Sequence, residues 1–286
     1  MSHKYSIKDL LLQSLLFILI CFTLLPIFII ILYSFSSPAE TKQYLEARNN
    51  YDPSILMEIK LGPDMFSLRQ YYHILIEDMT ILRYFFNSVK YTILSLVGQA
   101  LIIPMMAYSL SRFRFPGRDL LSFLIIVLML LPFQVTMVPN ILTLRELGLL
   151  DTIWSIILPN IISPFYIFLL RQFMTRLPNE MFEAAQIDGA GALNCYFHIL
   201  IPACRPIFGA AIALSFADCW NMVEQPLTYL TTKTQYYPLS VVFNQLNQEN
   251  SGFEFAGAAL YSLPALFVYM YFQEDILTGI QLTDLK

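Results

Sequence analysis

Long apolar segments alternate with short polar ones along the whole chain. Six segments are apolar on all sides for about 20 residues, the length with which a helix crosses the hydrocarbon core of a bilayer, whereas a helix in a soluble core keeps a polar face. The pattern therefore predicts an all-α membrane protein with six transmembrane helices. These predicted helices cover residues 10–33, 85–110, 120–138, 152–170, 206–222 and 255–272.

Prolines interrupt several of these segments. Pro104 lies in the second, Pro132 in the third, and Pro159 and Pro164 in the fourth. Because a proline removes one backbone hydrogen bond and bends a helix, we expect a kink in the second helix, an interruption in the third, and a fourth helix that is broken or bent. The fifth segment begins with small residues that permit close helix packing, namely Gly209, Ala210, Ala211 and Ala213.

Basic residues in short loops indicate the orientation. Arg112, Arg114 and Arg118 lie between the second and third predicted helices, and such positive charge marks the cytoplasmic side. Both chain ends are then cytoplasmic. The predicted cytoplasmic parts are residues 1–9, 171–205 and 273–286, the predicted external loops are 34–84 (helical around 68–76) and 223–254, and residues 85–286 form the core of the protein.

Composition agrees with a membrane protein and narrows the possible functions. Hydrophobic residues make up 57%, charged residues 13%, and the mean hydropathy is +0.58, values typical of polytopic membrane proteins. The small net charge of -4 and the lack of a basic patch argue against nucleic-acid binding. The four cysteines form no CxxC pair and the histidines are far apart, so we expect free thiols and no metal site.

A polar stretch rich in small residues lies between the fourth and fifth predicted helices. Asn179 is placed to cap a short helix there, and Gly189 is placed to end it in a left-handed turn. The residues with the spacing of one helix face are Met181, Ala184, Ala185 and Asp188. By these residues alone, the helix is either a docking element for a partner or an ordinary cytoplasmic connector.

The same stretch resembles the cytoplasmic signature of the permease subunits of ATP-binding-cassette importers. That signature reads E-A-A, three residues, G, nine residues, I-x-L-P, and only its Leu is replaced here, by Ile201. The matching residues are Glu183, Ala184, Ala185, Gly189, Ile199 and Pro202. Asp188, Gly189 and Ala190 also match the D-G-A of the carbohydrate importers of the maltose-type branch.

Shorter matches to that branch extend over nearly everything after Phe66. They include Asn87-Ser88, the run from Arg112 to Gly117, and Trp220-Asn221. The usual family ending, G-A-V-K-G, is replaced here by residues 282–286, so the resemblance does not support a contact between this tail and the ATPase. Residues 34–65 match no part of the family pattern.

The resemblance implies a function and a set of partners. It implies the permease subunit of a binding-protein-dependent importer of a sugar, in particular an oligosaccharide, in the cell membrane. The implied partners are a second permease subunit, an ATPase dimer that receives the Glu183 helix as a coupling helix, and an external solute-binding protein. The chain has no G-x-x-x-x-G-K-[ST] sequence, so we expect the partner to bind ATP, and expect neither catalytic residues nor a cofactor here.

Two further groups of residues are candidates for binding. Asp218 is costly within an apolar helix, so it either lines the translocation path or pairs with a basic or hydroxyl neighbour. The candidates for the path are Asp218, Trp220, Asn221 and Glu224, which combine an aromatic ring with polar groups suited to a sugar. The resemblance also implies that the binding protein contacts Gln235, Tyr236, Tyr237 and Asn244, for which the alternative is a solvated loop.

Three other functions are the alternatives to a sugar importer. An importer of the same class can carry another solute such as polyamine or phosphate, but Asp188-Gly189-Ala190 and Trp220-Asn221 favour sugar. A secondary transporter that works alone is indicated by inverted repeats, and the sequence shows none. An intramembrane enzyme needs paired ligands or facing carboxylates, whereas Asp218 stands alone.

Overall fold

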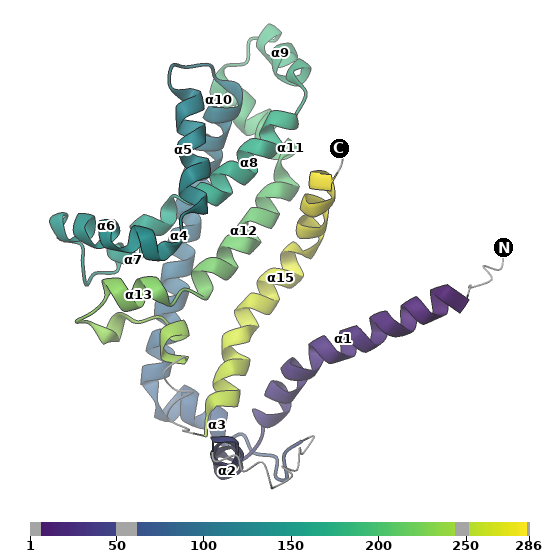
Figure 1. Ribbon diagram of the computed structural model, residues 1–286, viewed down its shortest axis with the longest axis vertical. Coiled ribbons are helices and arrows are strands. Elements are labelled where there is room, and N and C mark those ends of the chain that lie inside the picture. Colours follow the sequence, from purple (N-terminus) through teal and green to yellow (C-terminus); the bar gives the residue numbers. More distant parts are fainter. Residues whose placement is uncertain (1–6, 50–61, 244–251, 285–286) are drawn as a thin grey trace. The chain divides into compact units, whose positions relative to one another are not determined.

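The computed structural model describes residues 7–49, 62–243 and 252–284, and every regular element in those ranges is helical (Figure 1). The predicted all-α class is therefore confirmed. The helices are α1 (Ile7–Tyr33), α2 (Pro38–Asn49), α3 (Arg69–Tyr72), η1 (His73–Glu77), α4 (Met79–Arg112), α5 (Arg118–Leu130), α6 (Phe133–Glu146), α7 (Trp154–Ile161), α8 (Pro164–Arg176), α9 (Asn179–Ile187), α10 (Ala192–Cys195), η2 (Tyr196–Leu200), α11 (Ile201–Ala203), α12 (Arg205–Trp220), α13 (Glu224–Tyr229), η3 (Thr234–Tyr236) and α15 (Glu254–Asp284).

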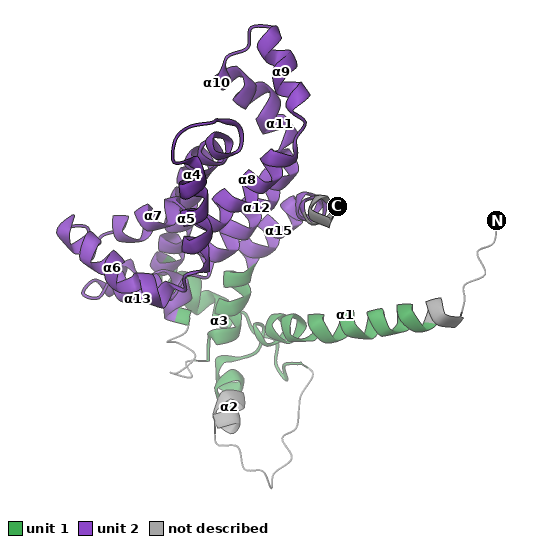
Figure 2. Ribbon diagram, turned by 45° about the horizontal axis from the view of Figure 1, so that its top comes forward, with its two compact units in different colours: residues 1–82, 243–262 green, residues 83–242, 263–286 purple. Residues whose placement is uncertain are grey.

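The chain divides into two compact units, coloured separately in Figure 2. Unit 1 comprises residues 1–82 and 243–262, and unit 2 comprises residues 83–242 and 263–286. In unit 2, α8 packs against both α5 and α12. Leu170 and Met174 of α8 belong to a buried cluster that also contains Ile103 of α4 and Leu200 of η2, so α8 lies at the centre of the unit.

Unit 1 is held together around the fully buried side chain of Gln70 on α3. Its Nε2 donates to the backbone oxygens of Tyr33 at 2.9 Å and Ser36 at 3.0 Å, and also to the hydroxyls of Ser36 and Thr41. Its Oε1 accepts from the backbone N–H of Ala256 at 3.2 Å. One amide thereby joins the end of α1, the start of α2 and the start of α15.

The predicted external loop over residues 34–84 contains more helix than the sequence indicated. Helical structure around 68–76 was expected and is present as α3 and η1. The 12-residue helix α2 is additional to that prediction. Pro38 is the first residue of α2, where a missing N–H costs nothing because the first helical N–H groups have no partner within the helix.

The third predicted segment, residues 120–138, is two helices. α5 and α6 meet at 109°, and Leu131 between them has the extended ψ of 124° that a residue before a proline favours. Residues 139–146 lie beyond the third predicted segment but belong to α6, which contains Pro139. In the fourth segment α7 ends at Ile161 and α8 begins at Pro164, so the helix is interrupted before a proline, as expected.

The other helix bounds differ moderately from the predicted ones. α4 begins six residues before the predicted 85 (85 − 79) and α15 ends beyond the predicted 272. Among the described residues, four helical stretches are long and apolar enough to cross a membrane: Leu11–Tyr33, Met79–Arg112, Trp154–Arg176 and Glu254–Gly279. Two bent pairs, α5 with α6 at 109° and residues 192–203 with α12 at 77°, bring the number to six if each pair is one span.

Small residues bring α12 and α15 together within unit 2. A Cβ added to Gly209 would overlap the carboxylate of Asp275, and one added to Gly279 would lie 3.2 Å from the Cβ of Ala210. The small residues at the start of the fifth predicted segment thus permit the close helix packing that was expected of them.

Replacing Gln70 with leucine should destabilise unit 1. The substitution leaves the buried carbonyls of Tyr33 and Ser36 and the N–H of Ala256 without this partner, and each such group costs about 1–3 kcal/mol. We expect Gln70→Leu to lower the midpoint of thermal unfolding of the detergent-solubilised protein. Gln172→Leu is the matched control, because Gln172 is exposed on α8. Equal midpoints for both variants would contradict the role of Gln70.

Candidate functional site

The polar stretch forms a short helix, α9, that ends as the sequence predicted. Gly189 has a φ of +82°, a left-handed conformation that glycine adopts without strain. The N–H of Gly189 donates to Gln186 O at 3.0 Å and that of Ala190 to Ala185 O at 2.8 Å, which closes the helix C-terminus. α9 lies at one end of unit 2, far from α13 (Figure 1).

The two faces of α9 differ from the expected arrangement. Phe182 is buried, and Ala185, three residues later, is half-buried against the same apolar cluster. Glu183 and Ala184 are exposed, and the Ile187 side chain is 86% exposed. Ala185 was expected to share a contact face with Ala184, but it lies on the inner face because Phe182 determines which side of the helix packs inward.

Arg112, the last residue of α4, binds the start of α9. Its Nη1 donates to Asn179 Oδ1 at 2.5 Å, and its Nη2 donates to the backbone oxygens of Met174 at 2.6 Å and Leu177 at 2.8 Å. The guanidinium also lies over the Phe182 ring, 4.2 Å from its centroid. Asn179 was expected to cap α9, but its side chain binds Arg112 and α9 has no side-chain cap.

The rest of the signature leads from α9 back to α12. Asp188 is exposed at the end of α9, Ala190 and Ile199 are half-buried against the apolar cluster, and Pro202 in α11 is exposed. The following helix α12 begins after a 77° bend. The residues of the signature are therefore not a single surface: some anchor the segment and others face outward.

The candidate path residues differ in how far their side chains are exposed. Asp218 is exposed on α12 and its Oδ2 accepts a hydrogen bond from Tyr166 on α8 at 2.6 Å, so the hydroxyl neighbour weighed as an alternative is present. Trp220 is only 2% exposed, stacked on Phe216 and edge-on to Phe85. The exposed Asn221 binds Ala217 O on its own helix.

Two further sets of hydrogen bonds lie near these residues in unit 2. Glu224 is exposed at the start of α13 and accepts from Gln134 of α6 at 2.9 Å and 3.1 Å. The sequence analysis did not predict a series of hydrogen bonds that begins at the buried Ser215. Ser215 donates to Gln99, and Gln99 donates to Asn160 O at 2.6 Å. Asn160 in turn donates to Gln225 at 2.7 Å. The signal of this series in the sequence is Gln99, an amide within an apolar segment.

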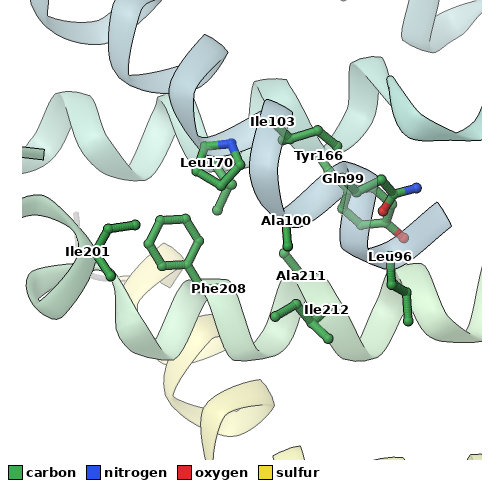
Figure 3. Close-up of a pocket in the computed structure, with 11 residues that line it drawn as sticks. Leu96, Gln99, Ala100, Ile103, Tyr166, Leu170, Ile201, Phe208, Ala211 and Ile212 are labelled. Atoms are coloured by element: carbon green, nitrogen blue, oxygen red, sulfur yellow. The ribbon is translucent and has the colours of Figure 1, made fainter. Parts of the chain in front are cut away.

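A cavity of about 140 Å³ lies between α4, α8 and α12 (Figure 3). Ile201 and Phe208 lie at one end of it and Gln99 and Leu96 at the other. Pro104 also lines it, in a turn of α4 that lacks the hydrogen bond a proline cannot donate. The cavity is mostly apolar, and within the described ranges no three His, Cys, Asp or Glu side chains gather where they could hold a metal ion.

The segment expected to contact a binding protein is anchored to α4 through its backbone. Asn87 donates to the oxygens of Gln235 at 2.9 Å and Tyr237 at 3.1 Å, and Tyr91 donates to Tyr236 O at 2.7 Å. The side chain of Gln235 is exposed, that of Tyr236 is partly exposed and that of Tyr237 is buried. Asn244 lies outside the described residues.

Comparison with known proteins gives consistent matches. Residues 100–275 match the model of the family described as binding-protein-dependent transport system inner membrane component. The arabinooligosaccharides transport system permease protein AraQ of Bacillus subtilis (strain 168) is 25% identical over 100% of this chain and 98% of its own length. The polygalacturonan/rhamnogalacturonan transport system permease protein YtcP of the same strain is 31% identical over 79% of this chain and 84% of its own length.

A solved structure has the same fold. It is a chain from the crystal structure of a bacterial ABC transporter involved in the import of the acidic polysaccharide alginate, with a TM-score of 0.77 and 24% identity. The alignment covers 96% of this chain and 99% of that chain.

Tyr166→Phe should destabilise the contact between α8 and α12. A hydrogen bond to a charged group is worth about 1.5–3 kcal/mol. Because Asp218 is exposed, we expect a smaller loss of about 1 kcal/mol. Asp218→Asn should cost much less in the Tyr166→Phe background than alone, because residues in one hydrogen bond are not additive.

Thermal unfolding of the four proteins of this double-mutant cycle measures the coupling. Tyr196→Phe is the control, because Tyr196 is also buried and contacts the same apolar cluster. Equal costs of Asp218→Asn in both backgrounds would show that the two side chains are not energetically coupled.

Proposed function

The chain belongs to the family of binding-protein-dependent transport system inner membrane components, and on this premise we propose that it is the permease subunit of an ATP-driven importer of oligosaccharides. It is a multi-pass membrane protein. In the proposed topology each bent helix pair crosses the bilayer once, which gives six spans with both chain ends in the cytoplasm. The arginines between α4 and α5 and the helix α9 then lie on the cytoplasmic side.

The observation that carries the proposal is the exposure of one face of an anchored helix. Phe182 and Arg112 hold the inner face of α9, while Glu183 and Ile187 remain exposed. A short helix with such a free face fits into a groove on a partner, where the Glu183 carboxylate can accept charge-assisted hydrogen bonds from a basic residue. The partner is the ATPase dimer, because this chain has no phosphate-binding loop of its own.

The mechanism we propose is alternating access. Closure of the ATPase subunits moves α9, and the helices that hold α9 pass this motion to the membrane spans, which then open to the other side. The further partners are a second permease subunit and an external binding protein that docks near Gln235 and Tyr236. The ATPase partner supplies the energy by hydrolysing ATP. This chain supplies the conformational change of the membrane helices and the translocation path for the sugar.

Sugar as the substrate is supported by the names of the relatives and by the exposed polar groups. AraQ and YtcP are described as permeases for arabino-oligosaccharides and for galacturonan-type polysaccharides. Asp218, Asn221 and Glu224 are exposed polar side chains on or next to α12. Such groups can exchange hydrogen bonds with sugar hydroxyls.

Reconstitution of the complete importer tests the function. We expect vesicles that contain this chain, its partner permease, the ATPase and the binding protein to accumulate a labelled oligosaccharide only when ATP is supplied on the ATPase side. Vesicles without the ATPase are the control. Accumulation in that control would identify a secondary transporter, and uptake of polyamine or phosphate in place of sugar would correct the substrate class.

Gly189→Ala should weaken coupling between the ATPase and transport. An alanine in the left-handed conformation costs about 1 kcal/mol or more, so the end of α9 should shift and lower both the ATPase activity stimulated by the binding protein and the uptake. Gly191→Ala is the matched control, because Gly191 has a φ of -74° and no atom lies within 4 Å of an added Cβ.

Glu183→Ala tests the exposed face in the same assay. We expect it to reduce stimulated ATPase activity and uptake while the complex still assembles, because the substitution removes a charge from the surface of α9 and no buried contact. Full activity of both Gly189→Ala and Glu183→Ala in assembled complexes would rule out α9 as the coupling element.

A further inference from the structure

We infer that Arg112 is a positioning residue that fixes α9 to the end of α4, so that the two helices move as one body during transport. This inference rests on the proposed coupling role of α9 and adds a named residue that transmits its motion. The sequence marked this arginine as one of three basic residues that indicate topology and as the start of a run shared with the carbohydrate importers, but it gave no partner for its side chain.

The first argument is the hinge between α8 and α9. The two helices are joined by Leu177 and Pro178, which have extended ψ values of 138° and 136°, so no helical hydrogen bonds continue from one helix to the next. The backbone hydrogen bonds that would hold one helix in line with the next are absent at such a joint. The peptide chain alone therefore does not fix the direction of α9 relative to the membrane helices.

The second argument is that Arg112 binds on both sides of this hinge. One guanidinium contacts Met174 O before the hinge, Leu177 O within it and Asn179 Oδ1 after it. The last carbonyls of α8 carry the negative end of the helix dipole, which favours a cation there. Within the described part of the chain no carboxylate forms an ion pair with Arg112, and its hydrogen bonds go to this joint.

The third argument is the contact with the inner face of α9. The Arg112 Cζ lies over the Phe182 ring, 4.2 Å from its centroid, and Phe182 is one turn along α9 from Asn179. An arginine can stack on an aromatic ring and donate in a fixed fork at the same time, whereas a lysine ammonium is a point charge that reproduces only part of this pattern. Two points of α9 are thus fixed to one side chain.

The consequence is a direct route from α9 into the transmembrane helices. Arg112 ends α4, and the same helix carries Gln99, which binds Ser215 on α12 and Asn160 O on α7. Pro104 lies between them beside the 140 Å³ cavity, where α4 has room to repack. A displacement of α9 can therefore reach α12 and α7 through α4.

The test uses the complete importer in vesicles with Arg112→Gln, Arg112→Lys and the control Arg114→Gln. Arg114 is an exposed neighbour in the same loop, so its replacement makes the same charge change without touching the joint. We expect Arg112→Gln to lower stimulated ATPase activity and uptake by about tenfold, because a charge-assisted hydrogen bond is worth about that factor in an equilibrium constant. Arg112→Lys should give an intermediate value, and Arg114→Gln should match the unaltered protein.

A distance measurement separates positioning from mere stability. Spin labels on Glu180→Cys in α9 and Met105→Cys in α4, both exposed positions, are combined with Cys21→Ser, which removes the exposed native thiol. We expect a narrow distance distribution that keeps its mean when ATP is added, and a distribution that broadens and shifts in Arg112→Gln. If Arg112→Gln fails to assemble, Arg112→Lys carries the same comparison.

The outcomes distinguish this inference from the proposed function. If Arg112→Gln keeps normal activity and a narrow distribution while Glu183→Ala loses stimulation, the role of Arg112 is overturned and the coupling role of α9 stands. If neither variant changes stimulation or uptake, the coupling role of α9 fails, and the inference about Arg112 fails with it.

Discussion

Backbone carbonyls left free where helices end or break must find donors, and in this chain side chains from other helices supply them. Arg112 binds Met174 O and Leu177 O at the end of α8, and Gln99 binds Asn160 O in the last turn of α7. In unit 1, Gln70 does the same at the end of α1. A backbone carbonyl that is buried without a donor is costly. The breaks in the helices thus determine where polar side chains are needed.

This constraint also decides which parts of unit 2 are joined. A polar side chain that binds a free carbonyl links two helices at the place where one of them is interrupted. Arg112, at the end of α4, binds the joint between α8 and α9. Gln99, nearer the middle of α4, binds α7 and α12. Helix interruptions are therefore also the places where side chains join one helix to another.

Features that depend on neighbouring residues in the sequence were predicted, whereas features that depend on contacts between distant residues were not. The helical class, the left-handed turn at Gly189 and the interruption before Pro164 follow from composition, from glycine and from proline. The 109° angle between α5 and α6 depends on packing, so Pro132 indicated an interruption but not its geometry. The position of Asn179 in the sequence predicts a helix cap, but its side chain binds Arg112, which is 67 residues away. The partners of Gln70 and Gln99 are also far from them in the sequence. A single sequence does not show such pairs.

The same constraint separates the candidate path residues. Side chains that hold backbone carbonyls, such as Gln99 and Asn87, cannot turn to a substrate without leaving a carbonyl unpaired. Asp218 and Glu224 bind other side chains, Tyr166 and Gln134, and both are exposed. When Glu224 turns to a sugar hydroxyl, the exposed amide of Gln134 can bind water, so the exchange costs little. When Asp218 does so, the buried hydroxyl of Tyr166 loses its acceptor. Among these residues the proposed path is therefore best assigned to Glu224, whereas the buried ring of Trp220 contributes to the packing of α12 against α4.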